Sequence, residues 1–148
     1  MKTKIKEYNK WLYQYDTSKL PIGLFEGKMG LCIYWYIQAR CYKNEDYEAK
    51  ASDLLDEIYE DLGNKTYPND FENGIIGIAF AIDYLLENEF VKGNRDDVLG
   101  EVDDVIFRNL YYEHIDKRTK RSAVEVDELW AGIYFAKPFN TFSFNRFE

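Results

Sequence analysis

The sequence predicts an all-α fold built from helical-hairpin repeats, and three observations support this. Apolar residues recur at helical spacing along most of the chain, whereas strand-like alternation is weak. Helical segments that are apolar on nearly all sides alternate with segments that carry an acidic face. A glycine motif recurs after 47 residues, a period typical of stacked hairpins. We expect one domain over residues 1–148.

The first two predicted helices differ in character. The first ends before a breaker cluster at residues 20–23. Its apolar face consists of Ile5, Tyr8, Leu12 and Tyr15. The second follows the glycines at 27 and 30 and is apolar on nearly every side over residues 31–37. A helix without a polar face has to be buried on most sides.

Residues 44–62 predict an amphipathic helix with a solvated acidic face. Its apolar stripe consists of Tyr47, Ala51, Leu54, Leu55, Ile58 and Leu62, and carboxylates occupy most of the remaining surface. The segment lacks the loop that binds calcium in helix–loop–helix proteins, so we interpret these carboxylates as solvation. Gly63-Asn64 is expected to end the helix in a left-handed conformation.

The pattern then repeats. A second mostly apolar helix is expected to start near Gly74 and to extend to Leu86, with its most apolar part over residues 78–86. Asp83 interrupts it, either as an active-site acid or because it faces a gap near the helix end or caps a neighbouring loop. Asn94 and Asp97 resemble a capping box, which begins a third amphipathic helix extending to about residue 112. Its stripe consists of Val98, Leu99, Val102, Val105, Ile106 and Leu110.

An internal repeat links the two apolar helices. Gly27 and Gly30 match Gly74 and Gly77 at a spacing of 47 residues, and Gly132 marks a weaker third copy. Aligning the neighbouring Phe-Glu pairs requires one inserted residue in the second copy, Asn73; the pairs are Phe25-Glu26 and Phe71-Glu72. A glycine lets the chain turn sharply and lets backbones approach.

Two arrangements use such hairpins, a HEAT-like solenoid and an α/α toroid. Both helices of a solenoid pair keep a polar edge, whereas a toroid has an inner ring of buried helices. The apolar helices favour a partial α/α toroid of about two and a half hairpins. Inner helices running in one sense bring their N-termini to one mouth. The candidate ligand-binding residues there are Glu26, Lys28, Asp70, Glu72 and Asn73. The acidic ones also suit an ordinary role as partners of the helix dipole.

The glycine motifs resemble those of lanthionine synthetase C-like (LanC-like) proteins. Gly27-x-x-Gly30-Leu31 and the run from Gly74 to Leu86 carry the resemblance, which covers roughly residues 20–112. It implies an α/α toroid of about seven hairpins. In the catalytic members of that family, a zinc ion held by two cysteines and a histidine promotes addition of a peptide thiol to a dehydroamino acid.

The chain departs from that family where catalysis would occur. No Cys-His-Gly motif is present, and Cys32, Cys41 and His114 match no family ligand position. We therefore expect no catalytic residue, no metal ligand and no cofactor, and a non-catalytic accessory or peptide-binding role in peptide modification. One alternative is a zinc-dependent thioether-forming cyclase completed by oligomerisation, with zinc in an assembled site. Another is a helical-repeat scaffold with no ligand at the mouth.

The remaining residues, 113–148, read as a degenerate repeat followed by a Phe-rich tail. Its rings are Phe135, Phe139, Phe142, Phe144 and Phe147. Exposed rings of this number favour association, so we expect the tail to pack against the partial toroid or another chain. A homo-oligomer or a partner protein is therefore expected, with a peptide as the candidate ligand. The 19 Lys and Arg against 27 Asp and Glu provide no basic surface for nucleic acid. The N-terminus lacks the apolar run of a signal peptide, and no stretch is long enough to cross a membrane, so we expect a cytoplasmic protein.

Overall fold

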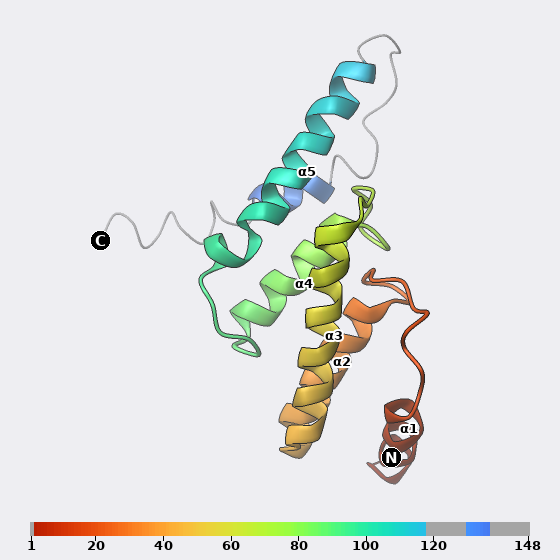
Figure 1. The fold of residues 1–148 in the computed structure, drawn as a ribbon. Helices are drawn as coiled ribbons and strands as arrows, with labels where there is room; N and C mark the ends of the chain where they lie inside the picture. The colour runs from red at the N-terminus through yellow and green to blue at the C-terminus, as the bar shows by residue number, and fades with distance from the viewer. Residues whose placement is uncertain (1, 118–129, 137–148) are drawn as a thin grey trace, which may run out of the picture.

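The computed structural model describes residues 2–117 and 130–136, and all regular secondary structure in these ranges is helical (Figure 1). The elements are α1 (Lys2–Tyr13), α2 (Lys28–Tyr42), α3 (Glu45–Asn64), α4 (Ile75–Glu87) and α5 (Arg95–Lys117), with a further helical segment at residues 130–136. The all-α prediction is confirmed. The expectations for the Phe-rich tail beyond Phe135 lie outside the described residues.

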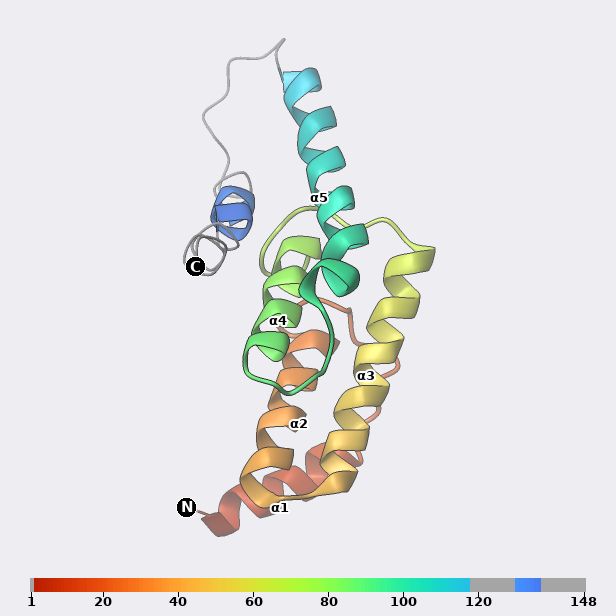
Figure 2. The same cartoon turned by 90° about the vertical axis from the view of Figure 1, so that its left-hand side faces the viewer.

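The helices α2 to α5 form two consecutive hairpins. The α2 and α4 helices run in the same direction, and α3 and α5 return beside them (Figures 1 and 2). The first hairpin turns at Lys43, whose φ of 50° is left-handed. The Asn44 side chain then caps α3 by accepting the Asp46 N–H at 2.9 Å. Asn94 caps the start of α5 as predicted, but its side chain accepts the N–H of Asp96 at 2.8 Å and not that of Asp97, the other member of the predicted capping box.

The predicted alternation of enclosed and half-exposed helices is clearest at α4 and α3. Nine of the 13 residues of α4 are buried. In α3 the buried residues are Ala51, Leu54, Leu55 and Ile58, and most of its carboxylates face solvent. The parallel pair α2 and α4 is what an inner ring requires, but the described residues do not close a ring, and the toroid stays a prediction. None of the described helices is both long and apolar enough to span a membrane.

One predicted boundary was wrong. The α3 helix continues through Gly63, which has no positive φ, and ends after Asn64. The Asn64 amide donates to the Glu60 carbonyl at 2.9 Å, as a residue inside a helix can do. The α4 helix begins at Ile75, directly after Gly74 as expected, because the repeated glycine motif itself starts the helix.

The first helix packs across the end of the α2–α3 hairpin (Figure 2). Leu12 and Asn9 are buried, and the Asn9 amide donates to the Gln38 side chain at 2.9 Å while accepting from the Tyr34 hydroxyl. The predicted apolar face is therefore rotated, since a buried Asn9 replaces part of it. The rings that this rotation leaves exposed are Tyr8, Trp11 and Tyr15.

Candidate functional site

The loops that precede α2 and α4 make matching backbone contacts with the helices they begin. The first N–H of α2 donates to the Pro21 carbonyl at 2.7 Å, and the first N–H of α4 donates to the Pro68 carbonyl at 2.9 Å. A Cβ atom on Gly27 would lie 2.7 Å from the Pro21 oxygen, and one on Gly74 would lie 2.3 Å from the Pro68 oxygen. Glycine is required at both positions because these contacts are with backbone atoms.

The second glycine of each motif meets the same steric demand. A Cβ on Gly30 would lie 2.3 Å from the Leu24 carbonyl oxygen, and one on Gly77 would lie 1.8 Å from the Phe71 oxygen. All these pairs are related by a shift of 47 residues. A Cβ on Gly132 would meet no atom of the described residues within 4 Å, and the segment that would hold the matching carbonyl lies outside them.

This constant shift corrects the sequence alignment of the two copies. By this shift, Leu24 in the first copy is equivalent to Phe71 in the second, and Phe25 is equivalent to Glu72. No residue is therefore inserted at Asn73. The two Phe-Glu pairs have the same residue types, but they do not occupy equivalent positions in the two copies. The correct alignment of the two copies is the one that matches the backbone carbonyls against which the glycines pack.

The two loops also contact each other directly. The Phe25 N–H donates to the Glu72 carbonyl at 2.8 Å. A Cβ on Gly23 would lie 2.6 Å from the Asn73 Cα, so the backbones cross where no side chain fits. The N-termini of α2 and α4 are therefore brought together, as the mouth hypothesis requires.

Four of the five predicted mouth residues lie on these loops. Glu26, Glu72 and Asn73 are exposed, and Asp70 is half-buried and accepts the Asn73 N–H at 2.6 Å. Glu26 has a φ of 51°, a left-handed conformation that is unfavourable for a residue with a side chain. We call the surface formed by Phe25, Glu26, Asp70, Glu72 and Asn73 the paired-loop surface.

The fifth predicted residue, Lys28, points elsewhere. It is buried, and its ammonium group lies 2.7 Å from a carboxylate oxygen of Glu57 on α3. The sequence could not show this, because the partner is 29 residues away. As a result, the charged side chains that the paired-loop surface presents are acidic.

Aromatic rings continue from the paired-loop surface. Phe25 is half-exposed and lies edge-on to Phe71, with ring centroids 6.1 Å apart. Phe71 in turn stacks on Trp130, at a centroid distance of 4.2 Å and an interplanar angle of 16°. Exposed carboxylates beside an aromatic row are suited to a ligand with cationic and apolar groups.

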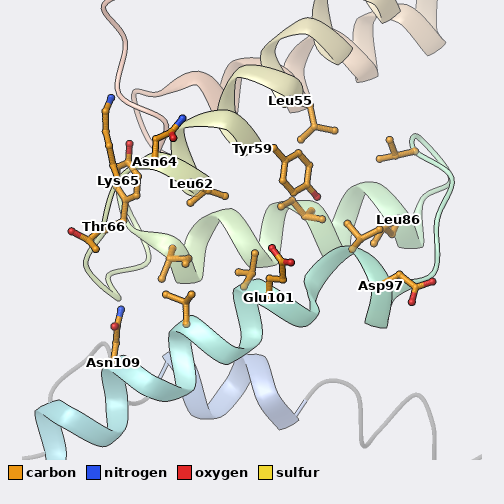
Figure 3. Close-up of a pocket in the computed structure, with 18 of the residues that line it drawn as sticks. Leu55, Tyr59, Leu62, Asn64, Lys65, Thr66, Leu86, Asp97, Glu101 and Asn109 are labelled. Carbon is orange, nitrogen blue, oxygen red and sulfur yellow. The ribbon is translucent and has the colours of Figure 1, made fainter.

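A groove with a volume of about 1250 Å³ lies between α3 and α5, with α4 as its floor (Figure 3). Aliphatic side chains from all three helices line it; they include Leu55, Leu62, Ile82, Leu86, Val98, Val102 and Val105. Tyr59 lies within it, and burial raises the pKa of its hydroxyl to about 12. Sequence reasoning missed this groove, because the stripe on α5 predicted a buried face and nothing indicated that α3 and α5 stand apart.

Asp83 belongs to a buried charged network, which agrees with the interpretation of a partner for a neighbouring element. Its carboxylate lies 3.0 Å from Arg95 Nε at the start of α5, and Arg95 Nη1 lies 3.5 Å from Asp103. The Tyr134 hydroxyl donates to Asp103 at 2.5 Å. Burial, that hydrogen bond and the nearby charge raise the pKa of Tyr134. The network joins α4, α5 and the 130–136 segment.

The two cysteines do not form a metal site. Cys32 is buried, its thiol donates to the Ala51 carbonyl at 3.3 Å, and burial raises its pKa to about 12. Cys41 is exposed. No group of three or more His, Cys, Asp or Glu side chains within the described ranges has an arrangement that would hold a metal ion. A zinc ligand is a thiolate, so Cys32 would have to lose this proton on binding a metal.

Comparison with known proteins adds no relative. No protein-family description, curated protein or solved structure matches this chain. The paired-loop surface and the groove are therefore the features from which a function can be inferred.

Proposed function

We propose that this chain is a non-catalytic, LanC-like helical-repeat protein that binds a peptide segment at the paired-loop surface, in the cytoplasm. The relationship is supported by two loop–helix units with matching backbone contacts, joined by the Phe25–Glu72 backbone hydrogen bond. Parallel helices beginning at such loops are the unit from which an α/α toroid is built. The role in peptide modification comes from the sequence resemblance.

The charge of the surface defines the peptide. Glu26, Asp70 and Glu72 supply three carboxylates, while the Lys28 ammonium is held by Glu57. Together with the half-exposed ring of Phe25, this favours a segment that combines Lys or Arg with an aromatic or aliphatic side chain. The exposed acidic character of the paired loops is the observation that carries the proposal.

Peptide binding at the paired-loop surface can be tested by fluorescence anisotropy, which measures the affinity for a labelled peptide that contains Lys and Phe. We expect Glu26→Gly combined with Glu72→Gln to weaken binding about tenfold or more, as loss of two interfacial charge contacts does. Glycine at 26 also removes the left-handed strain, so the variant should remain folded. A peptide with Glu in place of Lys should not bind.

The matched control is Asp46→Asn with Asp104→Asn, which removes two exposed carboxylates away from the loops. It should leave the affinity unchanged. Equal loss in both double variants would show that only net charge matters, and the proposal would fail.

The groove is a second candidate place for the peptide, favoured by its continuous aliphatic lining. Val98→Ser with Val105→Ser changes two half-buried residues of its wall. If the groove held the peptide, this variant would weaken binding while the loop variant would not. The opposite result assigns the peptide to the paired loops.

The two other hypotheses from the sequence have their own tests. Stoichiometric zinc in the freshly purified, assembled protein would favour a cyclase completed by oligomerisation, although the described cysteines do not fit such a site. A scaffold without a ligand at the mouth is favoured if replacing Glu26, Lys28 and Glu72 together leaves all partner binding intact.

A further inference from the structure

An exposed aromatic ridge runs along the outer side of α1 and into the turn after it, with Tyr8 and Trp11 on the helix and Tyr15 just beyond its end. Their exposed fractions are 52%, 58% and 44%. The ring centroids of Trp11 lie 5.8 Å from Tyr8 and 5.6 Å from Tyr15, so the three form one continuous surface. Tryptophan and tyrosine dominate the binding energy of protein interfaces, and a ridge of this size on a helix favours a partner.

The charge of α1 is opposite to that of the whole chain. This helix contains four lysines and one glutamate, whereas the formal charge of the protein is −8. Lys4 and Lys10 are exposed. Lys4 lies seven residues before Trp11, which places it on the ridge side of the helix. A partner of the ridge should therefore be acidic.

The chain itself supplies such a partner in α3. This helix contains eight carboxylates and one lysine. Only Glu57 and Asp61 among its acids form ion pairs within the described ranges, with Lys28 and Lys65. Asp53, Asp56 and Glu60 are exposed at i, i+3 and i+7 along one face. Like charges so spaced repel one another, and a cationic helix laid against them relieves that repulsion.

We propose that a second copy of this chain docks here, with the aromatic, lysine-bearing side of α1 against the acidic face of α3 in the partner. The end of α1 adjoins the start of α3, since the ring centroids of Tyr13 and Tyr47 are 6.1 Å apart (Figure 2). A two-fold axis beside this junction makes both contacts at once, each α1 meeting the other α3. Such reciprocal, self-complementary interfaces are the usual form of a homodimer.

Charge reversal on each side, followed by mixing, tests the pairing. Analytical ultracentrifugation of the whole protein at tens of micromolar should show a dimer. Lys4→Glu with Lys10→Glu, and separately Asp53→Lys with Asp56→Lys, should each raise the dimer dissociation constant about tenfold or more. An equimolar mixture of the two variants should form a heterodimer, because both contacts are then again between opposite charges. Recovery on mixing also shows that both variants are folded.

Several outcomes overturn the proposal. A monomeric wild-type protein would do so, as would a mixture that stays monomeric although each variant has the helical circular dichroism of the wild type. A wild-type monomer that floats with phosphatidylglycerol vesicles, and a Trp11→Ala variant that does not, would assign the ridge to an anionic membrane. Loss of dimer in the control Glu87→Gln would show that the effect is not specific to α1 and α3.

Discussion

At the scale of single residues, four glycines fix how the two hairpins begin. Gly27 and Gly74 lie against the carbonyls of prolines, and Gly30 and Gly77 against the carbonyls of Leu24 and Phe71. Glycine is required at these positions because a side chain would not fit, and not because of a left-handed backbone, since none of the described glycines has a positive φ. Each missing Cβ lets a loop fold back across the first turn of its own helix.

Replacing Gly77 by Ala should therefore destabilise the protein strongly. The new Cβ would lie 1.8 Å from a backbone oxygen, so the loop or the helix has to move. We expect the free energy of unfolding to fall by about 3 kcal/mol, measured by urea denaturation followed by circular dichroism. Gly100→Ala is the control, because a Cβ there meets nothing within 4 Å. It should stabilise α5 by about 0.5–1 kcal/mol, and equal effects at the two positions would contradict the steric explanation.

The sequence predicted these residues better than it predicted their neighbours. Spacing alone identified the four glycines, because a motif that repeats after 47 residues can be recognised in the amino-acid sequence. It misaligned Phe25 with Phe71, since the identity of two rings says nothing about which carbonyl a glycine must pass. It also placed Lys28 at the mouth, because the carboxylate that binds it lies on another helix.

At the scale of elements, helical periodicity found the long helices but not their relative placement. Caps and stripes predicted the bounds of α3 and α4 and the start of α5 closely, but α5 continues to Lys117, past its predicted end near residue 112. The α5 helix is attached to α4 at its first turns by the network of Asp83, Arg95 and Asp103, while the groove separates it from α3. The groove therefore depends on tertiary contacts that no local pattern encodes.

Arg95→Met tests the importance of that network. It withdraws the cation from Asp83, whose side chain is 4% exposed, so we expect a loss of about 3 kcal/mol in the free energy of unfolding. Adding Asp83→Asn should recover part of this loss, because the buried charge is then gone. A double-mutant cycle in urea should give a coupling energy of about 1–3 kcal/mol. Additive effects of the two substitutions would show that the ion pair contributes nothing to the attachment of α5.

At the scale of the whole molecule, buried thiol and phenol groups make the free energy of unfolding depend on pH in the alkaline range. Burial raises the pKa of Cys32 from 9.0 to about 12 and that of Tyr59 from 10.0 to about 12, and the pKa of Tyr134 is raised as well. The folded protein therefore holds these protons more tightly than the unfolded chain does. Their contribution to stability is complete below pH 9 and is lost as the pH rises towards 12.

We therefore expect the urea midpoint to be constant from pH 7 to 9 and to fall steadily above it. Between pH 9 and 10 the unfolded chain ionises at Cys32 before its tyrosines, so Cys32→Ala should flatten this part of the profile. The slope that Cys32 contributes there approaches about 1.4 kcal/mol per pH unit as an upper bound. Cys41→Ala is the matched control, because this thiol is exposed, and it should leave the profile unchanged. If the Cys32→Ala variant kept the wild-type slope, the Cys32 thiol of the wild type would have to ionise equally in the folded and unfolded states. That result would contradict the burial of this thiol between α2 and α3.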